Sequence, residues 1–173
     1  MHYKSTDPVF FIADSHFGHA NIIKYCDRPF KDVKEMDTVM VENWNKIVPK
    51  DGIVYHLGDF SFGYAKRYRE ALNGKIYLLK GNHDKEKESV YKVLFEEYLI
   101  YRKIHIDNIP IILFHYPIAN WDGKFHGSLH LHGHSHEKET REKNRLNISV
   151  ELWNYKPITF QQIKEKNDLY VPD

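Results

Sequence analysis

The sequence of 173 residues contains little cysteine and no long apolar run. Cys26 is the single cysteine, which excludes an intramolecular disulfide and every metal site built from several cysteines. We therefore expect any metal to be held by His, Asp, Glu or Asn. The apolar run at residues 9–13 is too short for a signal-peptide core or a membrane span, so we expect a soluble, cytoplasmic protein.

An excess of charge of either sign is also absent. The 25 Lys and Arg residues nearly balance the 24 Asp and Glu residues, which leaves a formal net charge of +1. This balance argues against an extended nucleic-acid surface. The length fits one domain of ordinary size, and we expect residues 1–173 to form a single domain.

What the sequence does contain is a series of apolar and β-branched runs that end in turn residues, as buried strands do. These runs are VFFIAD (9–14), GIVYHLGD (52–59), KIYLLKGNHD (75–84), IPIILFHYP (109–117) and SLHLHGHSH (128–136). Helices are expected at 33–48, 64–72 and 87–97, further strands at 98–106 and 145–150, and a short helix after Pro157. Strands alternate with helices as far as residue 98 and then follow one another directly. This order predicts an α/β protein with a mixed sheet or two facing sheets.

Side chains of the types that bind metal ions or transfer protons follow each of these strand runs. They are Asp14 and His16, then Asp59, then Asn82, His83 and Asp84, then His115, and finally His134 and His136. Strand ends in layered α/β folds converge on a crevice where ligands bind, so five such ends can bring their side chains to one place. A histidine-rich turn would explain only the last group. In contrast, His130 and His132 lie within the strand, and we expect them to be packed; His56 fits either a buried strand residue or a residue that orients a ligand.

The chemistry of this residue set fits two cations. Asp59 is the natural bridge because a carboxylate has two oxygens; Asp14, His16 and one late histidine then serve one ion, and Asn82, His115 and the other late histidine serve the second. Two divalent ions about 3.5 to 4 Å apart can share a water, lower its pKa and present hydroxide in line with a phosphorus centre. Mixed oxygen and nitrogen ligands suit transition metals, with Mn2+ as our first expectation and Fe, Ni, Co or Zn as alternatives.

The motifs DSH, GDF, GNHD, H and GHSH, in this order over about residues 9–150, resemble those of the calcineurin-like metallophosphoesterases, and the segment HFGHANIIKYCDRPF resembles small bacterial and phage-type members. The resemblance implies a four-layer α/β/β/α sandwich, with two mixed sheets flanked by helices. It also implies that His136 completes the first metal site and that His134 completes the second. It places His83 beside the substrate, as a proton donor or a stabiliser of the phosphoryl oxygens.

One position departs from the family pattern. Many members have a second Asp in GDxxD that orients the catalytic histidine, whereas GDFSF places Phe62 there. Asp84, the neighbour of His83, is then the candidate for a supporting catalytic role. His19 and Arg28 follow the first motif, and we expect either to bind a phosphate oxygen.

The residues and the resemblance together predict a binuclear phosphodiesterase that acts on a small nucleotide or a related phosphodiester and has no membrane partner. The chain has no insertion large enough to form a cap domain, and a site charge near +1 suits a singly charged diester. The alternatives are a phosphomonoesterase and a non-catalytic scaffold of the same fold. No HExxH, P-loop or G-x-S-x-G motif favours another class of hydrolase.

Overall fold

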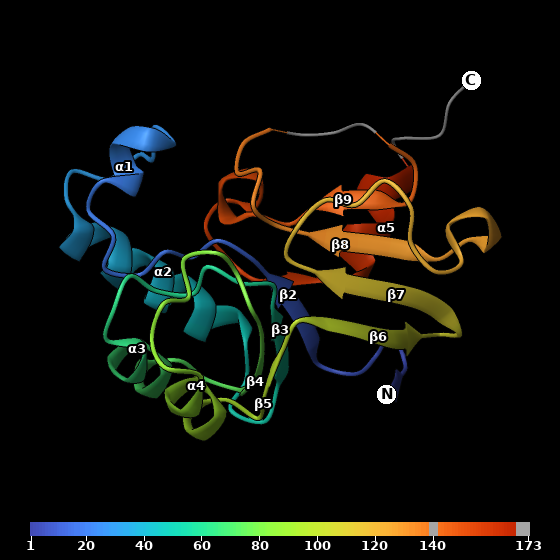
Figure 1. Ribbon diagram of the computed structural model, residues 1–173, viewed down its shortest axis with the longest axis horizontal. Helices are drawn as coiled ribbons and strands as arrows, with labels where there is room; N and C mark the ends of the chain where they lie inside the picture. Colours follow the sequence, from blue (N-terminus) through green and yellow to red (C-terminus); the bar gives the residue numbers. More distant parts are fainter. Residues whose placement is uncertain (139–141, 169–173) are drawn as a thin grey trace.

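The computed structural model describes residues 1–138 and 142–168, in which two sheets face each other (Figure 1). The first sheet has the order β10-β2-β3-β4-β5. Its strands are β2 (Val9–Ile12), β3 (Ile53–His56), β4 (Lys75–Leu79) and β5 (Glu97–Leu99), all parallel, with β10 (Ile158–Thr159) antiparallel to β2. Parallel neighbours require crossover connections, and helices supply them on one face of the sheet.

The second sheet is mixed and has the order β1-β6-β7-β8-β9. Its strands are β1 (His2–Tyr3), β6 (Tyr101–Ile106), β7 (Ile109–Phe114), β8 (Leu129–His132) and β9 (Arg145–Asn147). Strands β6 and β7 form an antiparallel hairpin, whereas β8 runs parallel to β7 and β9 runs parallel to β8. The parallel arrangement matters for the site because β7 and β8 end at the same edge.

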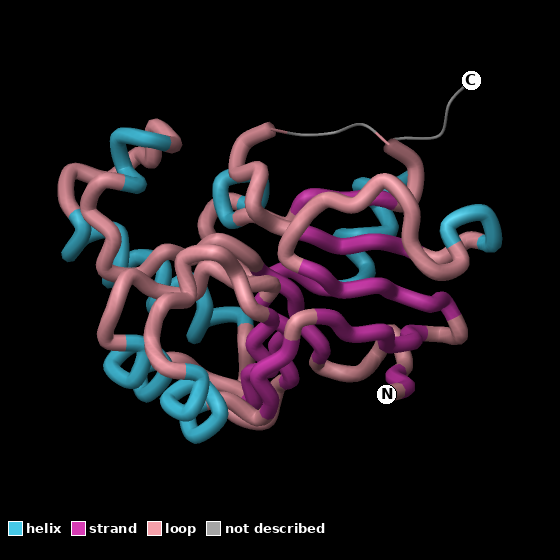
Figure 2. The backbone as a smooth tube through the Cα atoms, in the orientation of Figure 1, coloured by secondary structure: helices cyan, strands magenta, loops and turns pink. Residues whose placement is uncertain are grey.

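Helices flank the two sheets (Figure 2). They are α1 (Ile22–Tyr25), α2 (Val33–Ile47), α3 (Ala65–Ala71), α4 (Glu88–Leu94) and α5 (Phe160–Asp168), with 3-10 turns η1 (Lys124–His126) and η2 (Val150–Trp153). The amphipathic helix α2 begins where the Asp32 side chain accepts a hydrogen bond from the amide of Glu35. The two mixed sheets flanked by helices confirm the predicted fold class. Within the described ranges no helix has the length and apolar character needed to cross a bilayer.

Two hydrophobic cores follow from the alternation of side chains along the strands. Phe10 and Ile12 of β2 join Met36, Met40 and Trp44 of α2 in the core between the first sheet and its helices. The intervening β2 residues, Val9 and Phe11, face the second sheet in the other core. Phe160 and Ile163 of α5 belong to that second core. Because β2 is buried on both faces, its end is held rigidly.

Three predicted elements differ in extent. The expected strand 98–106 is divided at the exposed residue Ile100, so that β5 joins the first sheet and β6 joins the second. The helix expected at 87–97 ends at Leu94, because the chain must extend to form β5. The strand expected at 145–150 ends at Asn147, and the short strand β10 precedes the helix expected after Pro157.

Candidate metal centre

The seven predicted metal ligands lie together at the edge where the strands of both sheets end. Asp14, Asp59 and Asn82 follow β2, β3 and β4 of the first sheet, and the histidines at 115 and at 134 and 136 follow β7 and β8 of the second sheet. Backbone hydrogen bonds join the loops: the amide of Asp14 donates to the carbonyl of Gly58 (3.0 Å), and the amide of His16 donates to the carbonyl of Asp59 (2.9 Å). The site therefore lies at the junction of the two sheets.

Five of these seven residues have a left-handed backbone. The φ angles are 58° at Asp14, 50° at His16, 55° at Asp59, 69° at His134 and 49° at His136. Non-glycine residues rarely adopt this region, and such strain persists only where the surrounding structure enforces it. The loops thus turn sharply after each strand and direct these side chains inward.

Two carboxylates pack directly against glycines. A Cβ atom on Gly81 would lie 2.1 Å from Oδ1 of Asp59, and one on Gly133 would lie 2.4 Å from Oδ2 of Asp14. No side chain fits at either position, so glycine is required by the close approach of the carboxylates.

The Asp59 carboxylate stands between two histidines. Its Oδ2 atom lies 3.4 Å from Nε2 of His16 and 3.6 Å from Nε2 of His115, while its Oδ1 atom accepts a hydrogen bond from the backbone amide of His83 (2.7 Å). One oxygen is thus positioned by the protein and the other faces nitrogens from both sheets. Burial raises the pKa of this carboxyl group.

His115 presents a nitrogen lone pair to the centre of the site. Its Nδ1 atom lies 2.7 Å from the carbonyl oxygen of Leu57 and must therefore carry the proton, which leaves Nε2 unprotonated in the neutral ring. Nε2 faces Oδ1 of Asn82 at 3.0 Å, and the same oxygen lies 2.9 Å from Nδ1 of His134. Burial lowers the pKa of His115 to about 4, so the ring is neutral near pH 7. The lone pairs of His115 Nε2 and Asn82 Oδ1 face each other, and a cation bound between them would be coordinated by both.

His16 and Asp14 are also buried at this edge of the sheets. Neither ring nitrogen of His16 has a hydrogen-bond partner within the described part of the chain, and burial holds the pKa of its imidazole well below the usual range. Asp14 accepts hydrogen bonds from the Ser149 hydroxyl and the His134 amide, yet burial raises its pKa to about 7. Buried nitrogens without partners are costly unless a ligand satisfies them.

Among residues 1–138 and 142–168, three groups of side chains could hold a metal ion, because the ligand atoms within each group lie within 4.8 Å of one another. The groups are Asp14, His16 and His136; Asp14, Asp59 and His115; and Cys26, His136 and Glu151. The first two consist only of predicted ligands. The oxygen and nitrogen donors in these two groups fit divalent transition metals.

The sequence reasoning missed Glu151, which lies at the start of η2 and holds His136. Its Oε1 atom lies 2.9 Å from Nδ1 of His136, which leaves the other ring nitrogen for the centre. Burial would lower the pKa of His136, but hydrogen bonds with the Cys26 thiol and the Glu151 carboxylate outweigh burial and raise it to about 10. Metal binding must therefore release a proton from this histidine. No local motif marks Glu151, because its partners are distant in sequence.

Arg28, which we predicted to bind a phosphate oxygen, bonds to the framework of the protein. Its side chain is fully buried, and the guanidinium donates to Glu151 Oε1 (2.6 Å), to the carbonyl of Ser15 (2.9 Å) and to the carbonyl of Asp14 (2.8 Å). All its recorded partners are protein atoms of the framework. Arg28 instead fixes the loop that carries Asp14 and His16.

Asp84, for which we predicted a supporting catalytic role, also bonds to the framework. Its buried carboxylate accepts hydrogen bonds from the backbone amides of Asp59 (3.0 Å), Phe60 (2.9 Å) and Gly81 (2.7 Å). This arrangement ties the loop after β3 to the loop after β4. Asp84 therefore positions these two loops.

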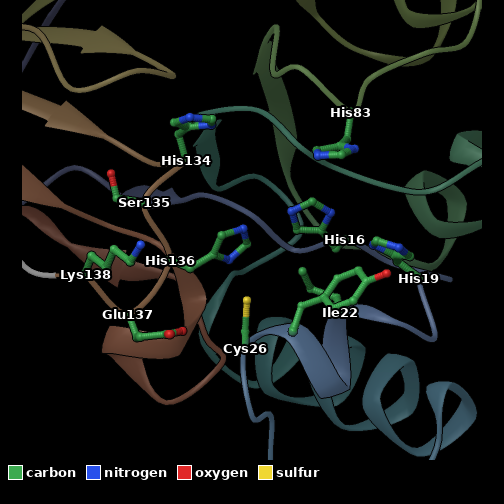
Figure 3. Close-up of a pocket in the computed structure, with 11 residues that line it drawn as sticks. His16, His19, Ile22, Cys26, His83, His134, Ser135, His136, Glu137 and Lys138 are labelled. Carbon is green, nitrogen blue, oxygen red and sulfur yellow. The ribbon is translucent and has the colours of Figure 1, made fainter.

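His19 and His83 line a cavity of about 580 Å³ in front of the ligand cluster (Figure 3). The ring of His83 lies 5.3 Å from that of His16, measured between centroids. The ring of His19 stacks on Phe62, the residue that departs from the GDxxD pattern, with centroids 4.4 Å apart, so Phe62 supports His19. Burial lowers the pKa of His19.

The remaining histidines of the strands are buried. His130 and His132 are 0% exposed, as expected for packed residues. The Nε2 atom of His56 lies 2.8 Å from the hydroxyl of Ser15, between the two ligands Asp14 and His16. His56 is therefore both a buried strand residue and a support for the first loop.

Comparison with known proteins places the chain in a family. No protein-family profile matches the chain. The protein MJ1445 of Methanocaldococcus jannaschii is 38% identical over 167 residues, which cover 90% of this chain and 88% of that protein. The chain belongs to the family of MJ1445. The gene 66 protein of Mycobacterium phage L5 is 24% identical, over 83% of this chain and 86% of its own length.

The fold of this chain is similar to that of a solved structure. The Aquifex aeolicus protein AQ665, of unknown function, has a TM-score of 0.73 and 30% identity, covering 91% of this chain and 98% of that protein. An archaeal phosphodiesterase has a TM-score of 0.47 and 18% identity, covering 82% of this chain and 81% of that chain. The two facing sheets, with the motifs gathered at one edge, are the arrangement that the motif resemblance implies.

Proposed function

We propose that this protein is a metal-dependent phosphoesterase with two divalent cations at the candidate centre. The observation that supports this most directly is the position of Asp59, whose Oδ2 atom lies 3.4 Å from a nitrogen of His16 and 3.6 Å from a nitrogen of His115. A single carboxylate oxygen between ligands from two sheets suits a bridge between two ions. Asp14, His16, Asp59 and His136 would hold one ion, and Asp59, Asn82, His115 and His134 would hold the other.

When bound, divalent ions supply Lewis-acid stabilisation of phosphoryl oxygens and increase the acidity of a water molecule. The chain's own residues orient and protonate the substrate. The backbone of His83 is fixed by Asp59, and its ring lies at the cavity wall, where it can donate a proton to the leaving oxygen. His19, on the same wall, can donate a hydrogen bond to a phosphoryl oxygen.

We propose a small phosphodiester, of the nucleotide type, as the substrate. The two carboxylates Asp14 and Asp59 offset only part of the charge of about +4 that two divalent ions bring, so the site attracts an anion. The cavity of about 580 Å³ is of the size that encloses a small molecule, and Tyr25 and Lys138 add an aromatic and a basic side chain to its wall. Phosphomonoester hydrolysis and a scaffold role without catalysis remain the alternatives for the test.

The test uses chelator-stripped protein, to which Mn, Ni, Co, Zn or Mg is added back in separate assays. We expect a transition metal, Mn2+ first, to restore hydrolysis of bis-p-nitrophenyl phosphate and Asp59→Asn to abolish it. Asp51→Asn, an exposed carboxylate after α2, is the matched control and should keep activity. Faster hydrolysis of p-nitrophenyl phosphate would identify a monoesterase. A folded protein that neither binds metal nor hydrolyses either ester would contradict the proposal and favour the scaffold.

A further inference from the structure

A third group of metal-ligand side chains lies beside the centre and shares only His136 with the ligands proposed for the phosphoesterase. It consists of Cys26, His136 and Glu151, whose ligand atoms are within 4.8 Å of one another. Cys26 follows α1, and Figure 3 shows its sulfur pointing toward the ring of His136. Cys26 and His136 both line the cavity, so an ion can reach them from solvent.

Glu151 has an oxygen available for a further ligand. Its side chain is only 5% exposed, and its Oε1 atom faces both the Arg28 guanidinium (2.6 Å) and Nδ1 of His136 (2.9 Å). Its other oxygen, Oε2, is buried and has no hydrogen-bond partner among the described residues. A buried carboxylate oxygen without a donor is unfavourable, and a cation beside it would remove that cost.

We propose that Cys26, His136 and Glu151 form a zinc site that competes with the phosphoesterase centre for His136. A thiolate, an imidazole nitrogen and a carboxylate are all common zinc ligands, and three protein ligands leave a fourth position for water. As zinc binds, the thiol proton of Cys26 and the Nδ1 proton of His136 both leave to solvent. A soft sulfur ligand selects zinc over manganese, magnesium or calcium. This site therefore distinguishes zinc from manganese, whereas the oxygen and nitrogen ligands of the centre accept both.

Competition follows from the chemistry of the imidazole ring. A neutral imidazole offers one lone pair, and the Nδ1 atom is the nitrogen beside Glu151. His136 can therefore give its lone pair to zinc at Nδ1 or to an ion at the centre through Nε2, but not to both. Excess zinc would withdraw a ligand from the first metal position. The effect on turnover rests on the proposed function, whereas the existence of the zinc site does not.

Cobalt(II) replaces zinc in the test because a thiolate bound to cobalt gives a near-ultraviolet charge-transfer absorption. Cys26 is the single cysteine, so this band can come from no other residue. We expect chelator-stripped wild type to develop the band on titration with cobalt, and Cys26→Ser to bind cobalt without it. Glu151→Gln should weaken the cobalt affinity measured from the band at least tenfold, with folding checked by circular dichroism.

The same titration after saturation with Mn2+ tests the competition. The cobalt concentration that gives half of the band should rise several-fold, and added zinc should reduce the turnover of wild type several-fold more than that of Cys26→Ser, each relative to its own uninhibited rate. The site is overturned if wild type binds cobalt without the band. It is also overturned if the band intensity per chain increases with protein concentration, because that result indicates a metal shared between molecules. An unshifted band after Mn2+ overturns the competition. A band in a protein without phosphoesterase activity supports the zinc site and refutes the proposed function.

Discussion

At the scale of single residues, the site depends on positions that accept only one type of residue. The Oδ1 atom of Asp59 needs the space that Gly81 leaves, and it accepts a hydrogen bond from the backbone amide of His83. The positive φ angles at Asp14 and Asp59 show that the backbone is also strained to present these carboxylates. Local conformation and ligand position are therefore coupled.

Gly81→Ala should disrupt the centre while the fold survives. The added Cβ would lie 2.1 Å from Oδ1 of Asp59 and would displace it, and such overpacking costs about 1–3 kcal/mol of the free energy of unfolding. We expect at least a tenfold loss of manganese affinity, measured by calorimetry. Gly127→Ala is the control, because its Cβ meets nothing within 4 Å and only its φ of +82° is strained. Equal metal affinity in the two variants would contradict the close approach.

His83→Ala should lower turnover and leave metal binding intact. The only hydrogen bond recorded between His83 and a proposed ligand comes from its backbone amide, which alanine retains. Loss of a general acid typically reduces the rate by about 10²–10⁴-fold. Activity and metal content should be measured together, with the exposed His126→Ala as the control. Loss of metal from His83→Ala would show that His83 helps to hold the ions.

At the scale of elements, the loops after the strands are held together by buried side chains that bond to the framework of the site. Asp84 joins the loops after β3 and β4, and Arg28 joins the loop after β2 to Glu151 of η2. These groups connect segments that are far apart in sequence. The rigidity of the centre is thus a property of the connected loops, and not of any one motif.

Arg28→Met should destabilise the protein far more than the loss of a surface ion pair. The substitution leaves the buried carboxylate of Glu151 without its guanidinium partner, for which the cost is about 3–5 kcal/mol. Lys92→Ala removes an exposed pair with Glu88 at 2.8 Å and should cost at most about 0.5 kcal/mol. Urea unfolding of both variants in chelator gives the comparison. The double variant Arg28→Met with Glu151→Gln should recover part of the loss, and no recovery would show that the pair is not the cause.

At the scale of the whole molecule, two cores fix the two sheets and bring their strand ends to one edge. The interior of this assembly also contains neutral histidines. Burial lowers the pKa of His56 to about 3 and that of His130 to about 4, from the ordinary value of 6.5. As the pH falls, these histidines therefore bind protons at a higher pH in the unfolded chain than in the folded chain.

In the metal-free protein, these buried histidines should consequently contribute less stability as the pH falls from 6.5 toward 4. The stabilising contribution of a neutral buried histidine is complete above the unfolded pKa and decreases below it, because protons then favour the unfolded chain. For His130 we expect a decrease on the order of 2 kcal/mol between pH 6.5 and 4.5. His130→Gln should reduce the pH dependence of urea midpoints, whereas the exposed His126→Gln should not. An unchanged slope in His130→Gln would mean that its pKa is not lowered by folding.

The sequence by itself determined the local elements and the types of ligand. The apolar spacing of residues 33–48 gave helix α2, and the apolar runs gave β2, β3, β4, β7 and β8, because periodicity and turn residues are local properties. Side chains that follow parallel strands converge, so the residues that end these runs could be expected at one place.

Only the tertiary structure decided which polar groups meet across the two sheets. The division of segment 98–106 between the sheets, the placement of Arg28 against Glu151, and the use of Asp84 as a tie between loops all depend on contacts between distant segments. Arg28 and Glu151 are 123 positions apart, and no local pattern records such a pairing. The physical reason is that burial and partner choice are set by the packed whole, whereas the sequence pattern records only which face of each element is apolar.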